Sequence, residues 1–178
     1  MFAPLEHWHE FYLLLGTAAA ALVALQFVAA SVGAGFLKFE TATATRTYMT
    51  PVIVHLSSVL LASALALVPW HNATTCAVVF GIASAIGTLY AGVLALRILT
   101  DSADHIEFDD RLCHGVAPPI AYAAGIAAAV MFRLGTGHAA EVLAAGLLLL
   151  LGVNIRNAWD STLFLVRKHT EAHTSHTP

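Results

Sequence analysis

The most informative shortage in this sequence is charge. Only 11% of the 178 residues are Asp, Glu, Lys or Arg, whereas about a quarter of the residues in soluble domains are charged. Between Thr47 and Leu96 the chain has none of these four residue types. So long an uncharged stretch argues against a water-soluble single domain and favours a membrane-spanning chain. The apolar content of 58% and the mean hydropathy of +0.77 agree with this interpretation.

Basic residues and cysteines are scarce too. The net charge is −3, and without a basic stripe the chain is not expected to bind nucleic acid. Cys76 and Cys113 form neither a CxxC pair nor a zinc pattern. The sequence also lacks the GxSxG, HExxH and Walker signatures of common enzymes. An enzymatic role stays open, but the sequence does not favour one.

Five apolar stretches predict five transmembrane helices. A helix needs about 20 apolar residues to cross the ~30 Å hydrocarbon layer. The stretches are residues 11–37, 50–70, 77–99, 113–132 and 139–166. The second is expected to begin with Thr50 as its N-cap and Pro51 in the first helical position. We therefore expect an all-α, polytopic membrane bundle formed by residues 1–167 as a single domain, followed by a disordered His- and Thr-rich cytoplasmic tail at 168–178.

The distribution of Lys and Arg predicts the orientation of this bundle. Most of these residues fall in segments on one side of the five predicted spans: Lys38, Arg46, Arg97, Arg111, Arg167 and Lys168. The other side has only Arg133, and Arg156 lies inside the last span. Positive residues concentrate in cytoplasmic segments. We expect the N-terminus outside, the C-terminus in the cytoplasm, and an integral protein of the bacterial cytoplasmic (inner) membrane with the lipid bilayer as its partner.

A belt of ionisable and amide side chains is predicted near the cytoplasmic boundary, with His55 about one turn into the second span. The belt consists of His55, Arg97, Asp110, His114, Arg156, Asn157 and Asp160. Charges inside a membrane are costly and usually face a bundle interior or a water-filled cavity. The belt is therefore the candidate site for a bound or conducted ligand. A purely structural network is the alternative, because Arg156 and Asp160 are four residues apart on one helix and can neutralise each other.

Cofactors are not expected, although two patterns keep them open. A group of histidines is predicted on the outer side: His7, His9, His71 and His138. Imidazole with nearby carboxylates suits zinc or copper, but a His-x-His in a flexible segment is a weak metal pattern. Haem needs two axial histidines facing each other at matching depth. Only His55 and His114 lie in predicted helices on the same side.

Small residues recur one helical turn apart in several predicted spans. One ridge is Ser84, Thr88 and Gly92, and another is Ala121, Gly125 and Ala129. Helices in lipid associate by close packing of such residues, so the ridges predict contacts within the bundle or between subunits. Pro118 and Pro119 lie early in the fourth span. Either they kink that helix or the helix begins there after an irregular stretch.

Three segments resemble parts of small bacterial multi-pass inner-membrane proteins that have no assigned activity. They are residues 11–20 (FYLLLGTAAA), 109–112 (DDRL) and 157–160 (NAWD). The resemblance implies a membrane protein over most of the chain. It also implies that the polar belt recurs in that group, but it supplies no activity to carry over.

Two functions from different classes fit these features. The first is an oligomeric channel or carrier for a small ion or solute, with His55, Arg156, Asn157 and Asp160 lining a polar, cytoplasm-facing vestibule. An oligomer is expected because five short helices enclose little interior. The alternative is a non-catalytic accessory or scaffold subunit of a larger membrane complex, favoured by the small-residue ridges and the lack of recognisable chemistry.

Overall fold

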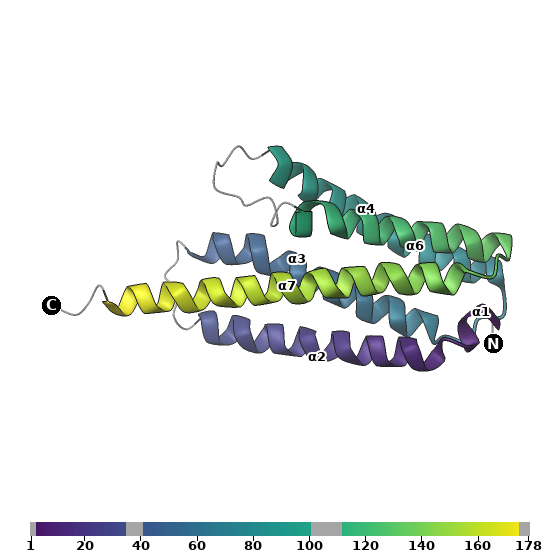
Figure 1. The fold of residues 1–178 in the computed structure, drawn as a ribbon, viewed down its shortest axis with the longest axis horizontal. Coiled ribbons are helices and arrows are strands. Elements are labelled where there is room, and N and C mark those ends of the chain that lie inside the picture. The colour runs from purple at the N-terminus through teal and green to yellow at the C-terminus, as the bar shows by residue number, and fades with distance from the viewer. Residues whose placement is uncertain (1–2, 35–40, 101–111, 175–178) are drawn as a thin grey trace.

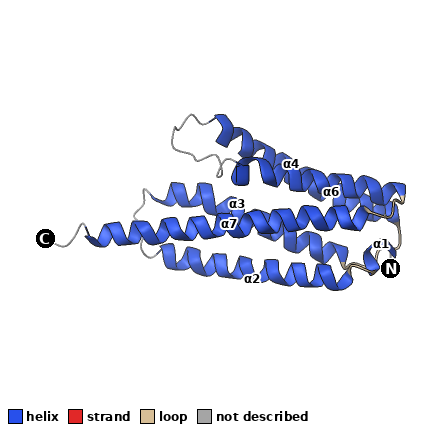
Figure 2. Ribbon diagram, in the orientation of Figure 1, coloured by secondary structure: helices blue, strands red, loops and turns tan. Residues whose placement is uncertain are grey.

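The computed structural model describes residues 3–34, 41–100 and 112–174, and the regular secondary structure in those ranges is helical (Figures 1 and 2). The elements are α1 (Ala3–Glu6), α2 (His9–Ala34), α3 (Thr41–Ala66), α4 (Ala73–Thr100), the π-helical turn η1 (Leu112–Val116), α6 (Ala117–Leu134) and α7 (Ala139–Thr174). The all-α prediction is confirmed for these residues. Helix α7 includes residues 168–174, which belong to the segment where the sequence predicts a disordered tail.

Four helices in the described ranges are long and apolar enough to span a membrane. Their apolar segments are His9–Ser31, Ala73–Arg97, Ala117–Leu134 and Ala139–Asp160. The apolar part of α3, Thr50–Ala66, is shorter than these four. By length and composition, the helices support an integral membrane protein.

Helix α7 lies at the centre of the helix contacts. It packs on α6, α3 and α2, while α4 packs chiefly on α6. Only a small contact joins α3 to α4, although residues 67–72 connect them directly. In Figure 1, α4 diverges from α3 towards the end at which α4 stops. The bundle therefore consists of a group formed by α2, α3 and α7, onto which the α4–α6 pair packs through α7.

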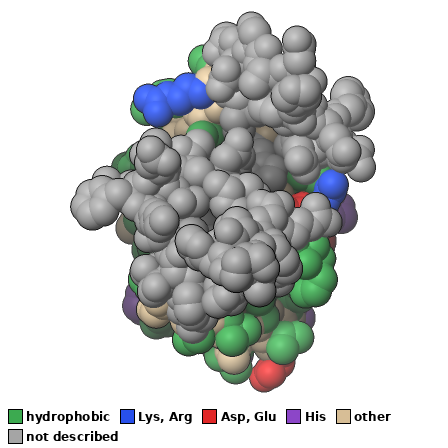
Figure 3. All heavy atoms as spheres, turned by 90° about the vertical axis from the view of Figure 1, so that its left-hand side faces the viewer, with side chains coloured by type: hydrophobic (Ala, Val, Ile, Leu, Met, Phe, Trp, Pro, Cys, Tyr) green, Lys and Arg blue, Asp and Glu red, His purple; other side chains and the backbone are tan. Residues whose placement is uncertain are grey.

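Many large apolar side chains point outwards, and alanine is frequent among the buried residues. On α4 the exposed stripe is Val78, Ile82, Ile86, Leu89, Val93 and Leu96, and its three- and four-residue spacing places it on one face. Figure 3 looks at the end of the bundle where α7 stops, and hydrophobic side chains are visible at several places along the edge of this view. This distribution suits lipid, where close packing of small residues holds the helices together.

Glycines allow α4 and α6 to approach closely. A Cβ atom added at Gly87 would overlap the Tyr122 ring, and one added at Gly125 would overlap the Ser84 hydroxyl. In contrast, no heavy atom lies within 4 Å of a Cβ at Gly92. The small-residue ridge of α4 therefore packs against α6 at Ser84, but a Cβ at Gly92 would contact no other described helix of this chain.

Glycines also allow close approach between α6 and α7 and between α2 and α3. A Cβ at Gly146 on α7 would lie 2.9 Å from the Ala121 carbonyl oxygen. One at Gly16 on α2 would lie 3.1 Å from the Ser63 Cβ. Backbones at this separation exclude larger side chains, so these glycines fix which helices pair.

The prolines occupy different positions in α3 and α6. The prediction that Thr50 caps the second helix and Pro51 takes its first position was wrong, because α3 begins at Thr41 and contains Pro51 in its interior. Neighbouring helices compensate for the lost hydrogen bond of such a proline in a membrane. In α6, Pro118 and Pro119 lie in the first turn, directly after η1. There the missing N–H groups have no helical partner to lose, so the helix begins at the prolines.

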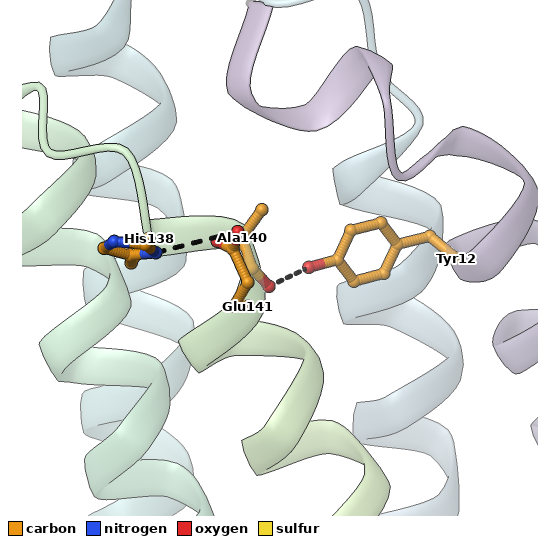
Figure 4. A network of polar contacts seen from close by, with 4 residues as sticks. All are labelled: Tyr12, His138, Ala140 and Glu141. Carbon is orange, nitrogen blue, oxygen red and sulfur yellow. Dashed lines mark hydrogen bonds and ion pairs between the residues drawn. The ribbon is translucent and has the colours of Figure 1, made fainter.

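At the opposite end, a buried tyrosine joins the first turns of α2 and α7. The Tyr12 hydroxyl donates a hydrogen bond to the Ala140 carbonyl at 2.8 Å (Figure 4). Beside it, His138 Nδ1 lies 3.8 Å from Glu141 Oε1, and both side chains are exposed. Tyr12 is fully buried, so its hydrogen bond fixes the register of α2 against α7.

Removing this hydroxyl tests the register. We expect Tyr12→Phe to lower the free energy of unfolding by about 1 kcal/mol, the net value of a typical protein hydrogen bond. The measurement is unfolding in detergent followed by tryptophan fluorescence. Thr17→Val is the matched control, because the exposed Thr17 hydroxyl bonds only to the Leu13 carbonyl of its own helix. Equal stability of Tyr12→Phe and the wild type would contradict this role.

Candidate functional site

Three helices meet at a buried histidine. His55 on α3 is 2% exposed, and its Nδ1 lies 2.9 Å from the hydroxyl of Tyr122 on α6. The ring of Tyr90 on α4 stands edge-to-face with the imidazole, with the centroids 5.7 Å apart. We name His55, Tyr90 and Tyr122 the His55 cluster. It bridges α3 to the α4–α6 pair, which α3 otherwise contacts little.

His55 lies further from the start of its helix than the sequence predicts. It is 14 residues beyond Thr41, the first residue of α3, which is about 21 Å along a helix. The added length comes from residues 41–49, which precede the apolar part of α3. His55 therefore lies near the middle of α3, and it is five residues beyond Thr50, where the apolar part of the helix begins.

The buried stripe of α7 changes character along its length. Its members are Leu143, Leu147, Leu150, Asn154 and Asn157, and their alternating spacing of four and three residues keeps them on one face. After Leu150 the stripe changes from leucine to asparagine. In the half of α7 that extends towards its C-terminus, the bundle interior is therefore polar.

Asn154 is the most deeply buried polar member of this stripe. Its side chain is 0% exposed, and its Nδ2 donates to the Leu150 carbonyl at 2.7 Å. Its Oδ1 accepts no hydrogen bond from the residues that the structure describes. A buried acceptor left without a donor costs about 1–3 kcal/mol, so Asn154 is an expensive residue at a position where leucine would continue the stripe.

Charged side chains lie beside the polar half of α7. Arg156 Nη1 donates to Cys113 Sγ of η1 at 2.8 Å, and Arg156 Nε lies 3.7 Å from Asp160 Oδ2. The Arg156 and Asp160 side chains are 44% and 42% exposed. The ion pair that the four-residue spacing predicts is therefore present, and Arg156 also attaches α7 to η1.

The remaining members of the predicted belt are placed as follows. Arg97 is exposed in the last turn of α4. His114 belongs to η1, but its side chain is not described, and Asp110 lies outside the described residues. The structure thus brings Arg156 and Asp160 together, buries Asn157 on the same helix, and places His55 in a separate cluster.

Sequence reasoning missed the two tyrosines of the His55 cluster. Tyr90 and Tyr122 lie in spans rich in small residues, and nothing in their spacing links them to His55. One signal was available, because Gly87 on α4 leaves the room that the Tyr122 ring occupies. That signal identifies a partner only after the pairing of α4 with α6 is known.

The histidines predicted for the outer side do not gather into a metal site among the described residues. His7, His9, His71 and His138 are exposed near the ends of α1, α2, α3 and α7. Within residues 3–34, 41–100 and 112–174, no three His, Cys, Asp or Glu side chains are placed to hold a metal ion. His138 has the nearby carboxylate of Glu141, which makes an ion pair when the imidazole is protonated.

Comparison with known proteins adds no relative. No protein-family model, curated protein or solved structure matches this chain. The case for a function therefore depends on the geometry of the chain's own residues.

Proposed function

We propose that this protein is a five-span protein of the bacterial cytoplasmic membrane that carries a small ion or polar solute across the bilayer as an oligomer. The observation that carries the proposal is the buried polar set formed by His55, Asn154 and Asn157. Polar side chains inside a membrane are costly and mark ion or solute pathways. Such a set is hard to explain in a protein that only needs to fill space between helices.

The length of α3 supports the fifth span. With 26 residues, the helix is about 39 Å long, and this exceeds the ~30 Å hydrocarbon layer. An odd number of spans places the two termini on opposite sides. The excess of Lys and Arg near the C-terminal side favours an outside N-terminus and a cytoplasmic C-terminus.

The polar set is one-sided, which favours a carrier over an open pore. From the cytoplasmic end, the exposed Arg156 and Asp160 are followed by Asn157 and Asn154 on α7 and then by His55 deeper in the bundle. Towards the outer end, the described core consists mainly of alanine, leucine and phenylalanine: Leu15, Ala19, Phe80, Ala128, Phe132, Ala140 and Leu143. A polar vestibule closed by a packed apolar half suits alternating access better than continuous conduction.

The buried groups also limit the solute. The interior groups are an imidazole, phenols, amides and the hydroxyls of Ser63 and Ser84, and the charged pair Arg156–Asp160 lies at the rim. The Asn154 Oδ1 atom offers an acceptor to a cation or to a solute with N–H or O–H groups. A large or strongly anionic solute has no matching cationic group in this described interior.

The alternative is an accessory or scaffold subunit, which the small-residue ridges favoured. The contacts of these residues within the chain weaken that argument. The small residues Gly87, Gly125 and Gly146 contact helices of the same chain. They therefore need no partner protein to explain them. An accessory role predicts that the polar residues can be neutralised without consequence.

Asp160→Asn distinguishes the two functions. The Arg156–Asp160 pair is partly exposed and contributes at most about 1 kcal/mol, so the variant should fold normally. We expect its transport rate to change several-fold in proteoliposomes tested with H⁺, Na⁺, K⁺ and Cl⁻ gradients and ion-sensitive dyes. Glu141→Gln, an exposed carboxylate at the opposite end of α7, is the control and should match the wild type.

The contradicting result is wild-type flux no higher than that of protein-free liposomes for every probe. Native mass spectrometry from mild detergent adds the subunit number. A homo-oligomer agrees with the proposal. A monomer that transports nothing, together with a silent Asp160→Asn variant, favours the accessory role.

A further inference from the structure

We propose that the transported ion is the proton and that His55 is the group that binds it. This inference rests on the proposed transport function and assigns its substrate. Histidine is the side chain whose ordinary pKa, about 6.5, lies within the physiological range. His55 is buried in the bundle, at the end of the proposed polar vestibule furthest from its cytoplasmic opening.

Among the groups described around it, His55 is the one whose ordinary pKa lies near neutral pH. From α4 and α6 it faces the phenols of Tyr90 and Tyr122, whose ordinary pKa is about 10. On α7 the nearest charged residues along the helix are Arg156 and Asp160 at the rim. Residues 11–34 of α2, 47–96, 112–132 and 142–155 contain no Asp, Glu, Lys or Arg.

The Tyr122 hydroxyl offers a hydrogen-bond acceptor to a protonated imidazole. Its oxygen lies 2.9 Å from His55 Nδ1, and the Tyr90 and Tyr122 ring centroids lie 5.7 Å and 5.6 Å from the centroid of His55. A charge inside a membrane is costly, and this acceptor meets part of its need for polar contacts.

The proton balance of the cycle is simple. A proton from cytoplasmic water converts the neutral imidazole into an imidazolium with an N–H at both ring nitrogens. The Nδ1–H then donates to the Tyr122 hydroxyl oxygen at the observed 2.9 Å separation. Loss of the proton towards the outer side restores the neutral ring, so one proton crosses for each cycle and no redox partner is needed.

Buried hydroxyls continue the polar track towards the outer side. Ser84 packs against Gly125, three residues along α6 from Tyr122. Ser63 lies two turns from His55 on α3, and its Oγ has no hydrogen-bond partner among the described residues. Both serines are buried. They supply hydroxyl groups in the otherwise apolar outer half of the bundle.

The test is proton uptake into proteoliposomes that contain the dye pyranine. Valinomycin and an outward K⁺ gradient supply an inside-negative potential, and the initial rate is measured between about pH 5 and 8. We expect His55→Gln to lower the rate about tenfold or more and to remove its pH dependence. Tyr122→Phe keeps the ring against Gly87 but removes the hydroxyl, and it should lower the rate and shift the pH midpoint.

Ser57→Ala is the matched control, because Ser57 is two residues from His55 on α3 and outside the His55 cluster. Its rate and pH profile should equal those of the wild type. Thermal melts and size-exclusion profiles identify folded variants. If His55→Gln does not fold, Tyr122→Phe decides, and an unchanged pH profile in that variant overturns the inference.

The result also separates this inference from the proposed function. Wild-type flux of Na⁺, K⁺ or Cl⁻ without proton movement overturns the proton assignment and leaves the transport function standing. A folded His55→Gln variant with wild-type proton flux overturns the role of His55 as the proton-binding group and leaves the transport function standing. The absence of flux for every probe overturns both.

Discussion

Gly87→Leu is expected to separate α4 from α6. A Cβ at this position already overlaps the Tyr122 ring, and the leucine side chain adds three further carbon atoms. The ring cannot withdraw freely, because the Tyr122 hydroxyl is held by His55 on a third helix. Overpacking of a closed core typically costs about 1–3 kcal/mol, and we expect the upper end of that range as a lowered midpoint of thermal unfolding in detergent.

Gly92→Leu is the control on the same helix. No heavy atom lies within 4 Å of a Cβ there, so the added side chain has room and the midpoint should stay at the wild-type value. Size-exclusion chromatography extends the comparison to assembly. Dissociation of the proposed oligomer by Gly92→Leu, with an unchanged monomer fold, would identify this face of α4 as a subunit contact. Equal melting of the two variants would contradict the observed packing of α4 on α6.

Part of the Gly87→Leu cost should be recoverable. Tyr122→Ala removes the ring that the leucine overlaps, so the double variant should lose less stability than the sum of the two single variants. Non-additivity of this kind is expected only for residues in contact. Strict additivity would indicate that Gly87 and Tyr122 do not touch.

The helical class and the apolar segments could be predicted from the sequence because they depend on local properties. Length and composition identify the apolar parts of α2, α4, α6 and α7. The Arg156–Asp160 pair follows from a four-residue spacing on one helix. Both inferences need no knowledge of which helices are neighbours.

The start of α3 could not be predicted in this way. Residues 41–49 are rich in threonine and include Arg46, so the hydropathy signal begins only at Thr50. Threonine is also a weak helix former. The structure continues the helix through this stretch, and this extension places His55 near the middle of α3.

The His55 cluster needs tertiary information. Each of its members comes from a different helix, and α3 and α4 contact one another little although they are consecutive in sequence. The pairing of α4 with α6 is set by the fit of Gly87 and Gly125 against Tyr122 and Ser84. A single sequence shows the small residues but not the faces that they meet.

Asn154→Leu is expected to stabilise the protein while it lowers the rate of the proposed transport. Leucine continues the buried stripe of Leu147 and Leu150 and removes the Oδ1 acceptor that no described donor satisfies. Removing a buried unsatisfied polar group should therefore raise the free energy of unfolding by about 1 kcal/mol. If Asn154 Oδ1 binds the moving ion or its water, the loss of that hydrogen bond should lower the transport rate by about tenfold.

The combination of outcomes makes this variant informative. Ile155→Leu, an exposed change one residue away on α7, is the control and should leave both properties unchanged. Normal flux in a stabilised Asn154→Leu variant would contradict the vestibule and make Asn154 a register residue of the bundle. A lower stability of Asn154→Leu than of the wild type would contradict the conclusion that Asn154 Oδ1 is an unsatisfied buried acceptor. Higher stability with lost flux is the pattern expected only where a polar residue is kept for a ligand, because packing alone would favour leucine at this position.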